Sequence, residues 1–364
     1  MASITKKSDG KYLIRVSKGT GKARTMINHT FRGPLKKAKD WAREQETLID
    51  SGKHQNSDLT FEAYRKLWLA VIKKRLAPLT YDNYEGNLRR NSETIDAIKL
   101  GDIRTHHIQA IYNELAPAVL RSLHATFNAC FGYAVKREYI RVNPCKNTDR
   151  PQRKRPDIVV LTEIEAIRFI KIARIMPGGL IFEFALHTGM RPEEYLGLRW
   201  SDIHGSEITV EQIVQYNRKG GGFYFAPPKT PKSRRRVPIS EDLRKRLITH
   251  RRLQNEHRLA MKGTWFNHNL VFPNIVGNPQ TIPNMTQRYF APIVEKCRFN
   301  KHLTPYGLRH TCATLLLLGD VNVKIVSERL GHASIALTLD TYSHVLPGMQ
   351  ADATDVLDRM LRVI

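Results

Sequence analysis

The amino-acid sequence predicts a mainly helical protein with small antiparallel β-sheets, an α+β chain of three domains. Three observations lead to this prediction. Residues 59–147 read as consecutive amphipathic helices, short strand-like runs lie near the N-terminus and around residues 207–239, and polar segments separate these regions. A length of 364 residues also suits two or three domains, at about 150 residues each.

Residues 1–56 are predicted to form a hairpin followed by one helix. Residues 11–16 (KYLIRV) and 23–31 (ARTMINHTF) have strand character, and glycines lie between them. A helix follows over about residues 34–49, with a proline in its first turn. The region has 13 Lys and Arg against 5 Asp and Glu, a net charge of +8. We interpret it as a small basic DNA-binding domain.

Residues 59–147 are predicted to form one compact bundle of four helices. Thr60 can cap the first helix, and the last runs from about Val119 to Tyr139 before the helix breaker Asn143-Pro144. The segment that follows, RPQRKRP, is basic and rich in proline. We expect it to be an exposed linker, either a simple spacer or a contact for DNA phosphates.

The third domain is predicted to span residues 158–364. It opens with a capping box at Thr162 and Glu165, and helices dominate it. Three strand-like pieces at 207–215, 222–226 and 234–239 interrupt the helices. We interpret them as a small antiparallel meander.

Charge narrows the class of partner. The formal net charge is +25, spread over the whole chain, which favours a nucleic acid over a membrane surface. No apolar run approaches the roughly 18 residues of a membrane span, and the polar N-terminus does not resemble a secretory signal. We therefore expect a soluble cytoplasmic protein. Its cysteines show no C-x-x-C pair, so we expect four buried, reduced thiols and no zinc site (Cys130, Cys145, Cys297, Cys312).

Two candidate residues lie in loops. Arg191 follows a Gly-Met turn and precedes Pro192, which starts a helix, so its side chain can point into a cleft; taken alone, it reads as an ordinary surface arginine. Lys229 lies at a turn among Lys232 and Arg234 to Arg236. It can donate a proton, or belong to a solvated basic hairpin that binds phosphates nonspecifically.

Three further candidates lie near the C-terminus. Arg309 suits a phosphate clamp, because a guanidinium matches two phosphate oxygens at once. The neighbouring His310 is more typical of helix packing than of catalysis. His332 follows the end of a helix at Gly331, and Tyr342 lies among leucines, a position more typical of the core than of a nucleophile.

Taken together, these residues resemble the signature of the tyrosine recombinase (phage integrase) family. The similarity lies in TGMRPEEYLGLRWSDI, PKTPKSRRRVPI, LTPYGLRHTCAT and LGHASIALTLDTYSHV, spread over residues 188–345. The ordered set is Arg191, Lys229, Arg309, His332 and Tyr342. The layout ahead of them also resembles integrases that have an arm-type DNA-binding domain (1–56), a helical core-type DNA-binding domain (59–147) and a catalytic domain (158–364).

The resemblance implies a DNA strand transferase that needs neither a metal nor ATP and has no cofactor. Arg191 and Arg309 would clamp the scissile phosphate, and Tyr342 would attack phosphorus to give a 3′-phosphotyrosyl link. Lys229 would protonate the leaving 5′-oxygen, and His332 would hydrogen-bond the phosphate. Cationic side chains would supply the charge that a metal otherwise provides, and the sequence shows no carboxylate cluster of metal-site character.

One position departs from the family pattern. The family has histidine three residues before the second arginine, where this chain has Tyr306. A phenol can donate a hydrogen bond to phosphate, but its ordinary pKa of about 10 makes it a poor base near pH 7. The proton acceptor for Tyr342 is therefore open. His302 is one alternative, without a geometric argument for it.

The expected partners follow from the resemblance. They are double-stranded DNA attachment sites of a phage or mobile element, a homotetramer on two duplexes in the bacterial cytoplasm, and optionally a host DNA-bending protein and an excision factor. Two other functions remain open: a type IB topoisomerase that relaxes supercoils, and a sequence-specific DNA-binding regulator without chemistry. Residues 350–364 carry apolar side chains at helical spacing, which could dock on a neighbouring subunit or on their own domain.

Overall fold

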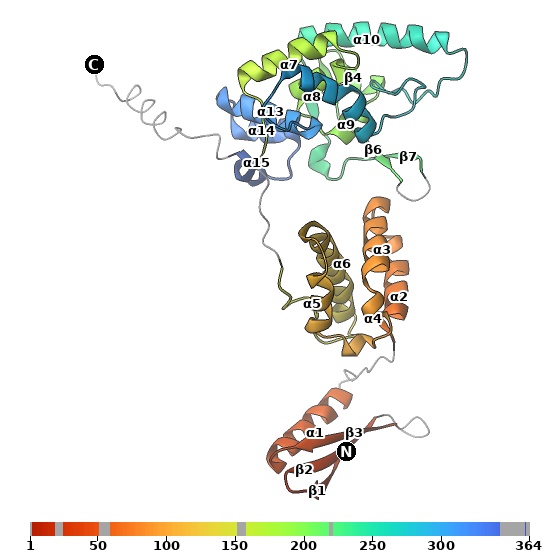
Figure 1. Cartoon of the computed structure of the whole chain (residues 1–364), viewed down its shortest axis with the longest axis vertical. Helices are drawn as coiled ribbons and strands as arrows, with labels where there is room; N and C mark the ends of the chain where they lie inside the picture. Colours follow the sequence, from red (N-terminus) through yellow and green to blue (C-terminus); the bar gives the residue numbers. More distant parts are fainter. Residues whose placement is uncertain are drawn as a thin grey trace. The chain divides into compact units, whose positions relative to one another are not determined.

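A computed structural model of the chain describes residues 2–18, 25–50, 59–150, 158–217, 221–342 and 361 (Figure 1). The chain divides into two compact units, Met1–Lys154 and Arg155–Ile364. Helices of up to 20 residues dominate the structure, and the strands form small antiparallel sheets, which confirms the predicted fold class. Across the described ranges, no helix combines the length and the apolar character that a membrane crossing requires.

The first unit opens with a three-stranded antiparallel sheet in the order β1-β2-β3. Its strands are β1 (Ala2–Ser8), β2 (Lys11–Lys18) and β3 (Thr25–Arg32), and α1 (Leu35–Asp50) packs on them. A small core joins the sheet to the helix (Ile14, Val16, Ala38, Ala42). The hairpin and helix were predicted. The edge strand β1 was not, because its mostly polar sequence buries little.

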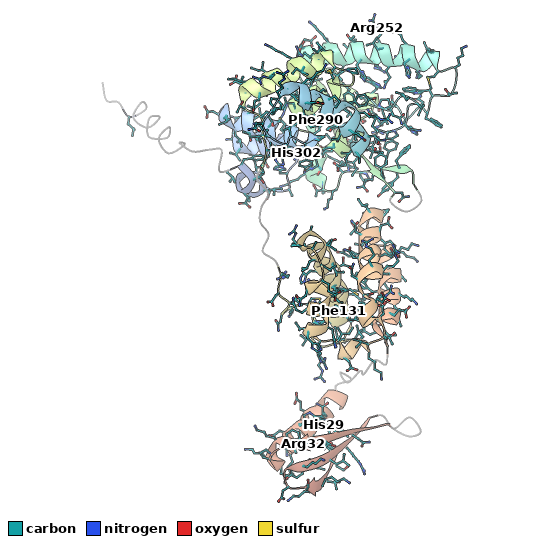
Figure 2. The ribbon with its side chains drawn as sticks, viewed as in Figure 1. His29, Arg32, Phe131, Arg252, Phe290 and His302 are labelled. Atoms are coloured by element: carbon teal, nitrogen blue, oxygen red, sulfur yellow. The ribbon has the colours of Figure 1, made fainter. Side chains whose placement is uncertain are left out.

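A helical bundle follows in the same unit. It contains α2 (Phe61–Lys73), α3 (Pro78–Asn91), α4 (Glu93–Asp96), α5 (Thr105–Asn113) and α6 (Pro117–Lys136), and a 3₁₀ turn at Leu100–Asp102. The hydroxyl of Thr60 accepts a hydrogen bond from the backbone of Ala63, as predicted for the N-cap. The bundle has its own apolar core, in which Phe131 is fully buried and stacks on Phe61 at 5.2 Å (Figure 2).

The second unit is built mainly from helices around a large apolar core. Its helices are α7 (Glu163–Ile175), α8 (Leu180–Thr188), α9 (Pro192–Leu196), α10 (Glu241–Ala260), α11 (Ile282–Met285), α12 (Ala291–Cys297), α13 (Pro305–Leu318), α14 (Val323–Leu330) and α15 (Ile335–Tyr342). The predicted capping box at Thr162 and Glu165 is present at the start of α7. All four cysteines of the chain are buried and unpaired, as predicted.

The predicted meander is wrong in its connectivity. Strands β4 (Ile203–His204), β5 (Glu207–Thr209) and β8 (Arg236–Pro238) form one sheet, whereas β6 (Ile213–Tyr216) and β7 (Phe223–Ala226) form another. The run expected as a single strand over 207–215 therefore breaks, and its halves join different sheets. Close packing of β6 on Gly197 accompanies this break: a Cβ at Gly197 would lie 2.9 Å from the backbone nitrogen of Val214.

Helix α13 brings the candidate residues together. It packs against α8 and α14, and α14 packs against α15. A small apolar cluster of its own holds α13, α14 and α15 together (Ala313, Leu317, Val326, Leu330, Tyr342). The C-terminal end of α8 and the start of α9 thus lie beside the helices that carry the second arginine and the tyrosine.

Candidate active site

Arg191 lies between α8 and α9. Gly189 ends α8 at a φ of 64°, in the left-handed region that favours glycine, and Pro192 occupies the first turn of α9. The backbone nitrogen of Arg191 donates to Oε2 of Glu194 at 2.9 Å, and its Nη1 donates to Oε1 at 2.8 Å. The side chain of Arg191 is 27% exposed, so the guanidinium is fixed on one side and reaches solvent on the other.

Glu194 is a buried carboxylate between two arginines. Besides Arg191, it accepts hydrogen bonds from Nη1 and Nη2 of Arg235 at 3.2 and 2.9 Å. Burial alone would raise the pKa of Glu194, but Arg235 and Arg191 outweigh it and lower that pKa. The sequence did not single out Arg235 from its basic run, yet its side chain is only 6% exposed.

Arg309 is buried and held by main-chain oxygens. Its Nη1 donates to the carbonyl of Gly189 at 2.7 Å, and its Nη2 donates to the carbonyl of Leu330 at 2.8 Å. These carbonyls lie at the ends of α8 and α14, where the helix dipole favours a cation. Burial and the nearby Arg191 lower the pKa of Arg309 to about 10, so it stays protonated at neutral pH.

Tyr342 ends α15 and is almost completely buried. Its hydroxyl lies 2.8 Å from Nδ1 of His310 on α13, and the two rings meet at 5.7 Å. Burial raises the pKa of Tyr342 to about 12, although Arg309 and Arg191 lower it in part. The phenol is therefore protonated at neutral pH. His310, interpreted from the sequence as a packing residue, touches the hydroxyl of the predicted nucleophile.

Tyr306 lies one helical turn before His310 on α13. Its ring meets that of His310 at 5.4 Å, and its side chain is 40% exposed. Tyr306 is also close enough to Arg191, Arg309 and Tyr342 to influence the pKa of each. The phenol that replaces the family histidine thus borders the same group of side chains.

His332 follows the left-handed Gly331, where α14 ends, and is half-buried. Its Nδ1 lies 2.8 Å from Oγ1 of Thr338. Burial and the positive charges of Arg309 and Arg191 lower the pKa of His332 to about 3, so its imidazole is neutral at neutral pH. Five of the six predicted residues are thereby brought together.

Lys229 is the predicted residue that the structure does not bring to this cluster. It is exposed in the loop between β7 and the 3₁₀ turn Pro231–Ser233, and it makes no hydrogen bond or ion pair within the described part of the chain. Its neighbour Lys232 donates to the carbonyl of Ala333, beside His332, at 2.8 Å. The end of the Lys229 loop is therefore anchored next to the cluster.

The arrangement is suited to binding and polarising a phosphate. The cationic side chains Arg191, Arg235 and Arg309 share one buried carboxylate, which leaves excess positive charge around the Tyr342 hydroxyl. Within the described residues, Arg309 donates two of its five N–H groups to carbonyls, so others can bind an anion. Guanidinium groups, a tyrosine hydroxyl and neutral imidazoles are the components of a phosphoryl-transfer site.

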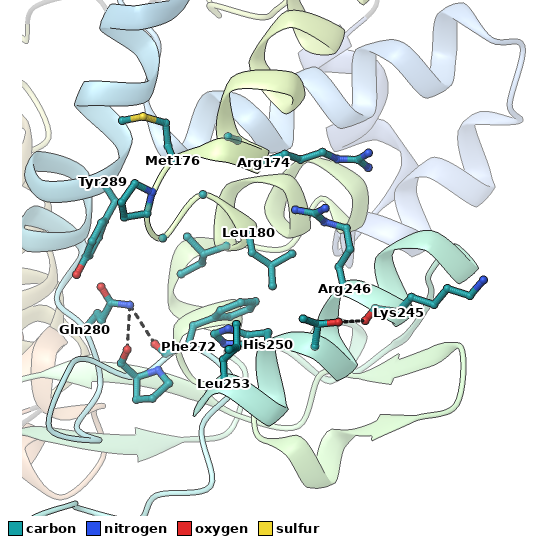
Figure 3. Close-up of a pocket in the computed structure, with 17 residues that line it drawn as sticks. Arg174, Met176, Leu180, Lys245, Arg246, His250, Leu253, Phe272, Gln280 and Tyr289 are labelled. Atoms are coloured by element: carbon teal, nitrogen blue, oxygen red, sulfur yellow. Dashed lines mark hydrogen bonds between the residues drawn. The ribbon is translucent and has the colours of Figure 1, made fainter. Parts of the chain in front are cut away.

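A separate cavity of about 580 Å³ lies among α7, α8 and α10 (Figure 3). Leu180 and Phe272 contribute apolar walls, while Arg174, Arg246 and Lys245 come from its other side. None of the predicted site residues lines this cavity. The arginine–tyrosine cluster, and not this cavity, is the candidate active site.

The chain is similar in sequence to phage integrases over most of its length. Residues 160–348 match the phage integrase family, and residues 60–116 match the N-terminal SAM-like domain of phage integrases. The chain is 30% identical, over 95% of both chains, to the "Tyrosine recombinase XerC-like" protein of Caldanaerobacter subterraneus. It is 26% identical to the ICEBs1 integrase of Bacillus subtilis, over 99% of this chain and 100% of that one. The chain belongs to the phage integrase family of tyrosine recombinases.

Solved structures share the fold. The Tn1549 transposon integrase in complex with transposon right end DNA superimposes with a TM-score of 0.65 at 20% identity, over 82% of this chain and 99% of that one. The lambda integrase tetramer bound to a Holliday junction gives 0.56 at 19% identity, over 92% and 94% of the two chains.

Proposed function

We propose that this chain is a site-specific integrase of a phage or other mobile element, which cuts and rejoins DNA through a 3′-phosphotyrosyl intermediate. The observation that carries the proposal is the position of the Tyr342 hydroxyl. Arg309 and Arg191 are both near enough to this buried hydroxyl to lower its pKa, and it lies 2.8 Å from Nδ1 of His310. Family membership and the DNA-bound neighbours of similar fold support the same function.

The proposed roles follow from the geometry. Arg191 and Arg309 bind the non-bridging oxygens of the scissile phosphate, and Tyr342 attacks phosphorus and displaces the 5′-oxygen. Glu194 positions Arg191 through two hydrogen bonds and does not react. His332 is neutral, and in the tautomer whose Nδ1 accepts from the Thr338 hydroxyl it can donate to the phosphate from Nε2. Tyr306 is a second hydrogen-bond donor at the rim.

Lys229 is proposed as the acid that protonates the leaving 5′-oxygen. Its loop is anchored beside His332 through Lys232, and the exposed ammonium can turn toward a bound DNA strand. Arg191, Arg309 and Lys229 around one phosphate would supply the positive charge that a divalent metal provides in other phosphoryl-transfer sites. We therefore propose that cleavage needs neither a metal nor ATP, because the protein–DNA ester conserves the bond energy.

The rest of the chain is proposed to bind DNA. Residues 1–56 would bind arm-type sites, residues 59–147 the core site, and residues 158–364 would carry out catalysis. The net charge of +8 in residues 1–56 supports the first assignment. Four strand exchanges on two duplexes require a homotetramer, optionally with an excision factor and a DNA-bending protein of the bacterial host. The reaction is proposed to take place in the cytoplasm of that host.

A covalent-adduct assay tests the proposal. The protein is incubated with nicked DNA from the region that flanks its gene, and the products are separated on a denaturing gel. The unmodified chain is expected to form a protein–DNA adduct, with and without excess EDTA. Tyr342→Phe should bind the DNA and form no adduct, while Tyr289→Phe, a control on a tyrosine outside the cluster, should form it normally.

The outcomes separate the possible functions. Absence of an adduct with the unmodified chain would favour a DNA-binding regulator, and an adduct in Tyr342→Phe would refute the assignment of the nucleophile. Loss of cleavage in EDTA would refute metal independence. Recombination of two separate duplexes would distinguish an integrase from a topoisomerase, which relaxes one.

A further inference from the structure

His310 is a half-buried imidazole that has no role in the mechanism above. It follows Arg309 on α13, and its Nδ1 lies 2.8 Å from the hydroxyl oxygen of Tyr342. At neutral pH the phenol is protonated and the imidazole is neutral. In the tautomer that carries its proton on Nε2, the neutral imidazole accepts this hydrogen bond at Nδ1 from the phenol, which places the proton to be removed directly on the path to His310.

We propose that His310 is the general base that takes the proton of Tyr342 when the tyrosine attacks DNA. This inference rests on the proposed function, because it concerns the chemistry of the same tyrosine. It also answers the question that Tyr306 leaves open. A base on the next turn of the same helix takes the place of the imidazole that the family has at position 306.

The other candidates are less well placed. Nδ1 of His332 is engaged by Thr338 at 2.8 Å. His302 is exposed, and within the described residues no hydrogen bond joins it to Tyr342. Tyr306 is itself a phenol and cannot hold an extra proton near neutral pH. Among the described residues, His310 is the one histidine whose ring nitrogen contacts the reacting oxygen.

The charges around His310 explain when it acts. The groups near it are Tyr306 and Arg309 on its own helix, Tyr342 on α15, and His332 in the loop before α15. Burial, followed by the charge of Arg309, lowers the pKa of His310 to about 4 in the free protein. A bound phosphate brings negative charge to the arginines and so stabilises an imidazolium beside them. DNA binding thus raises the basicity of His310 at the moment it is needed.

The attack of Tyr342 on the scissile phosphate transfers one proton and exchanges one bond to phosphorus. The Tyr342 proton moves to Nδ1 of His310, the Tyr342 oxygen forms a bond to phosphorus, and the bond from phosphorus to the 5′-oxygen breaks. The leaving oxygen takes its proton from a different group, proposed above as Lys229. In the rejoining step the 5′-hydroxyl returns its proton to Lys229 and attacks phosphorus, and the bond from phosphorus to the Tyr342 oxygen breaks. That oxygen regains its proton from His310.

The test compares His310→Ala and His310→Asn with the unmodified chain in single-turnover cleavage. Asparagine keeps a hydrogen-bonding group near the position of Nδ1 but cannot accept the proton. Both variants should cleave about 10²–10⁴-fold more slowly at pH 7. His302→Asn is the matched control and should cleave normally. DNA binding by each variant, measured in parallel, shows that the site is folded.

Two further readouts separate a base from a structural residue. Replacing the bridging 5′-oxygen of the scissile phosphate by sulfur removes the need for an acid, so this substrate should restore cleavage by Lys229→Ala but not by His310→Ala. Added imidazole, or a rise in pH toward 10, should accelerate His310→Ala cleavage more than that of the unmodified chain.

Different outcomes would overturn the role of His310 and the proposed function. Cleavage by His310→Asn within threefold of the unmodified rate overturns the inference, as does full restoration of His310→Ala by the sulfur substrate. Failure of the unmodified chain to form an adduct on that substrate would instead overturn the proposed function.

Discussion

Neutralising Glu194 should have two effects at once: it should destabilise the second unit, and it should release the guanidinium of Arg191 from its fixed position. In Glu194→Gln the side chain keeps its shape, but Arg235 and Arg191 lose the charge that both of them share. Glu194 is 2% exposed and Arg235 is 6% exposed, so water compensates little for the lost charge. Removing one partner of a buried ion pair costs about 3–5 kcal/mol, and glutamine retains one hydrogen bond, so we expect about 3 kcal/mol.

Thermal unfolding measures this loss. For a unit of this size, 3 kcal/mol lowers the melting temperature by roughly 6–12 °C. Hydrogen exchange of the amides of α8 and α13 reports on the second unit alone. The control is Glu193→Gln, which neutralises the neighbouring carboxylate. Glu193 forms no ion pair in the described residues, so its variant should melt near the parent temperature.

The effect of Glu194 should also depend on pH. Its pKa is lowered in the folded chain, whereas an unfolded glutamate titrates near 4.3. The carboxylate therefore contributes its full stability above about pH 4.3, and that stability is lost as the pH falls through the lower folded value. The melting temperatures of parent and Glu194→Gln should converge as the pH falls below 4. A variant that melts within 1 °C of the parent at pH 7 would refute the reasoning.

Two other predictions concern the rim of the site and the N-terminal region. Tyr306→Phe removes one hydrogen-bond donor and should slow single-turnover cleavage about tenfold at unchanged DNA affinity, since a hydrogen bond to a charged group contributes about 1.5–3 kcal/mol. Tyr306→His should keep or raise the rate of cleavage. A Phe variant that cleaves at the parent rate would mean that the phenol only packs. Deleting residues 1–56 should abolish recombination of full attachment sites and spare cleavage of isolated core sites, so normal recombination by the shortened chain would contradict the arm-binding assignment.

The order of the helices and the main members of the cluster could be predicted from the sequence, because they depend on local patterns. Arg191 and Arg309 stand beside helix-starting prolines or caps that short-range rules identify. Tyr342 was recognisable only within the full set, since a tyrosine among leucines looks like a core residue. The structure shows why: it is both a core residue and a member of the site.

His310 and Arg235 could not be assigned from the sequence, because their roles depend on packing between distant segments. Only the middle arginine of the run Arg234–Arg236 turns inward; Arg234 is 58% exposed and Arg236 73% exposed. In an extended chain successive side chains point to opposite faces, so the sequence predicts that Arg235 lies opposite to Arg234 and Arg236. It does not predict which of the two faces is buried. The role of His310 depends on the contact between α13 and α15, which brings His310 to the hydroxyl of Tyr342.

The support of Arg309 has a consequence for sequence drift. Main-chain carbonyls at Gly189 and Leu330 hold its guanidinium, so no exchange of a neighbouring side chain can delete these acceptors. Insertions that move the end of α8 or α14 would remove them. Glycine is favoured where each helix ends, because Gly189 has a φ of 64° and Gly331 a φ of 66°, in the left-handed region that other residues rarely adopt. Descendants of this chain can therefore replace most of the residues around the arginine and keep it in place, provided that the two helices end at the same glycines.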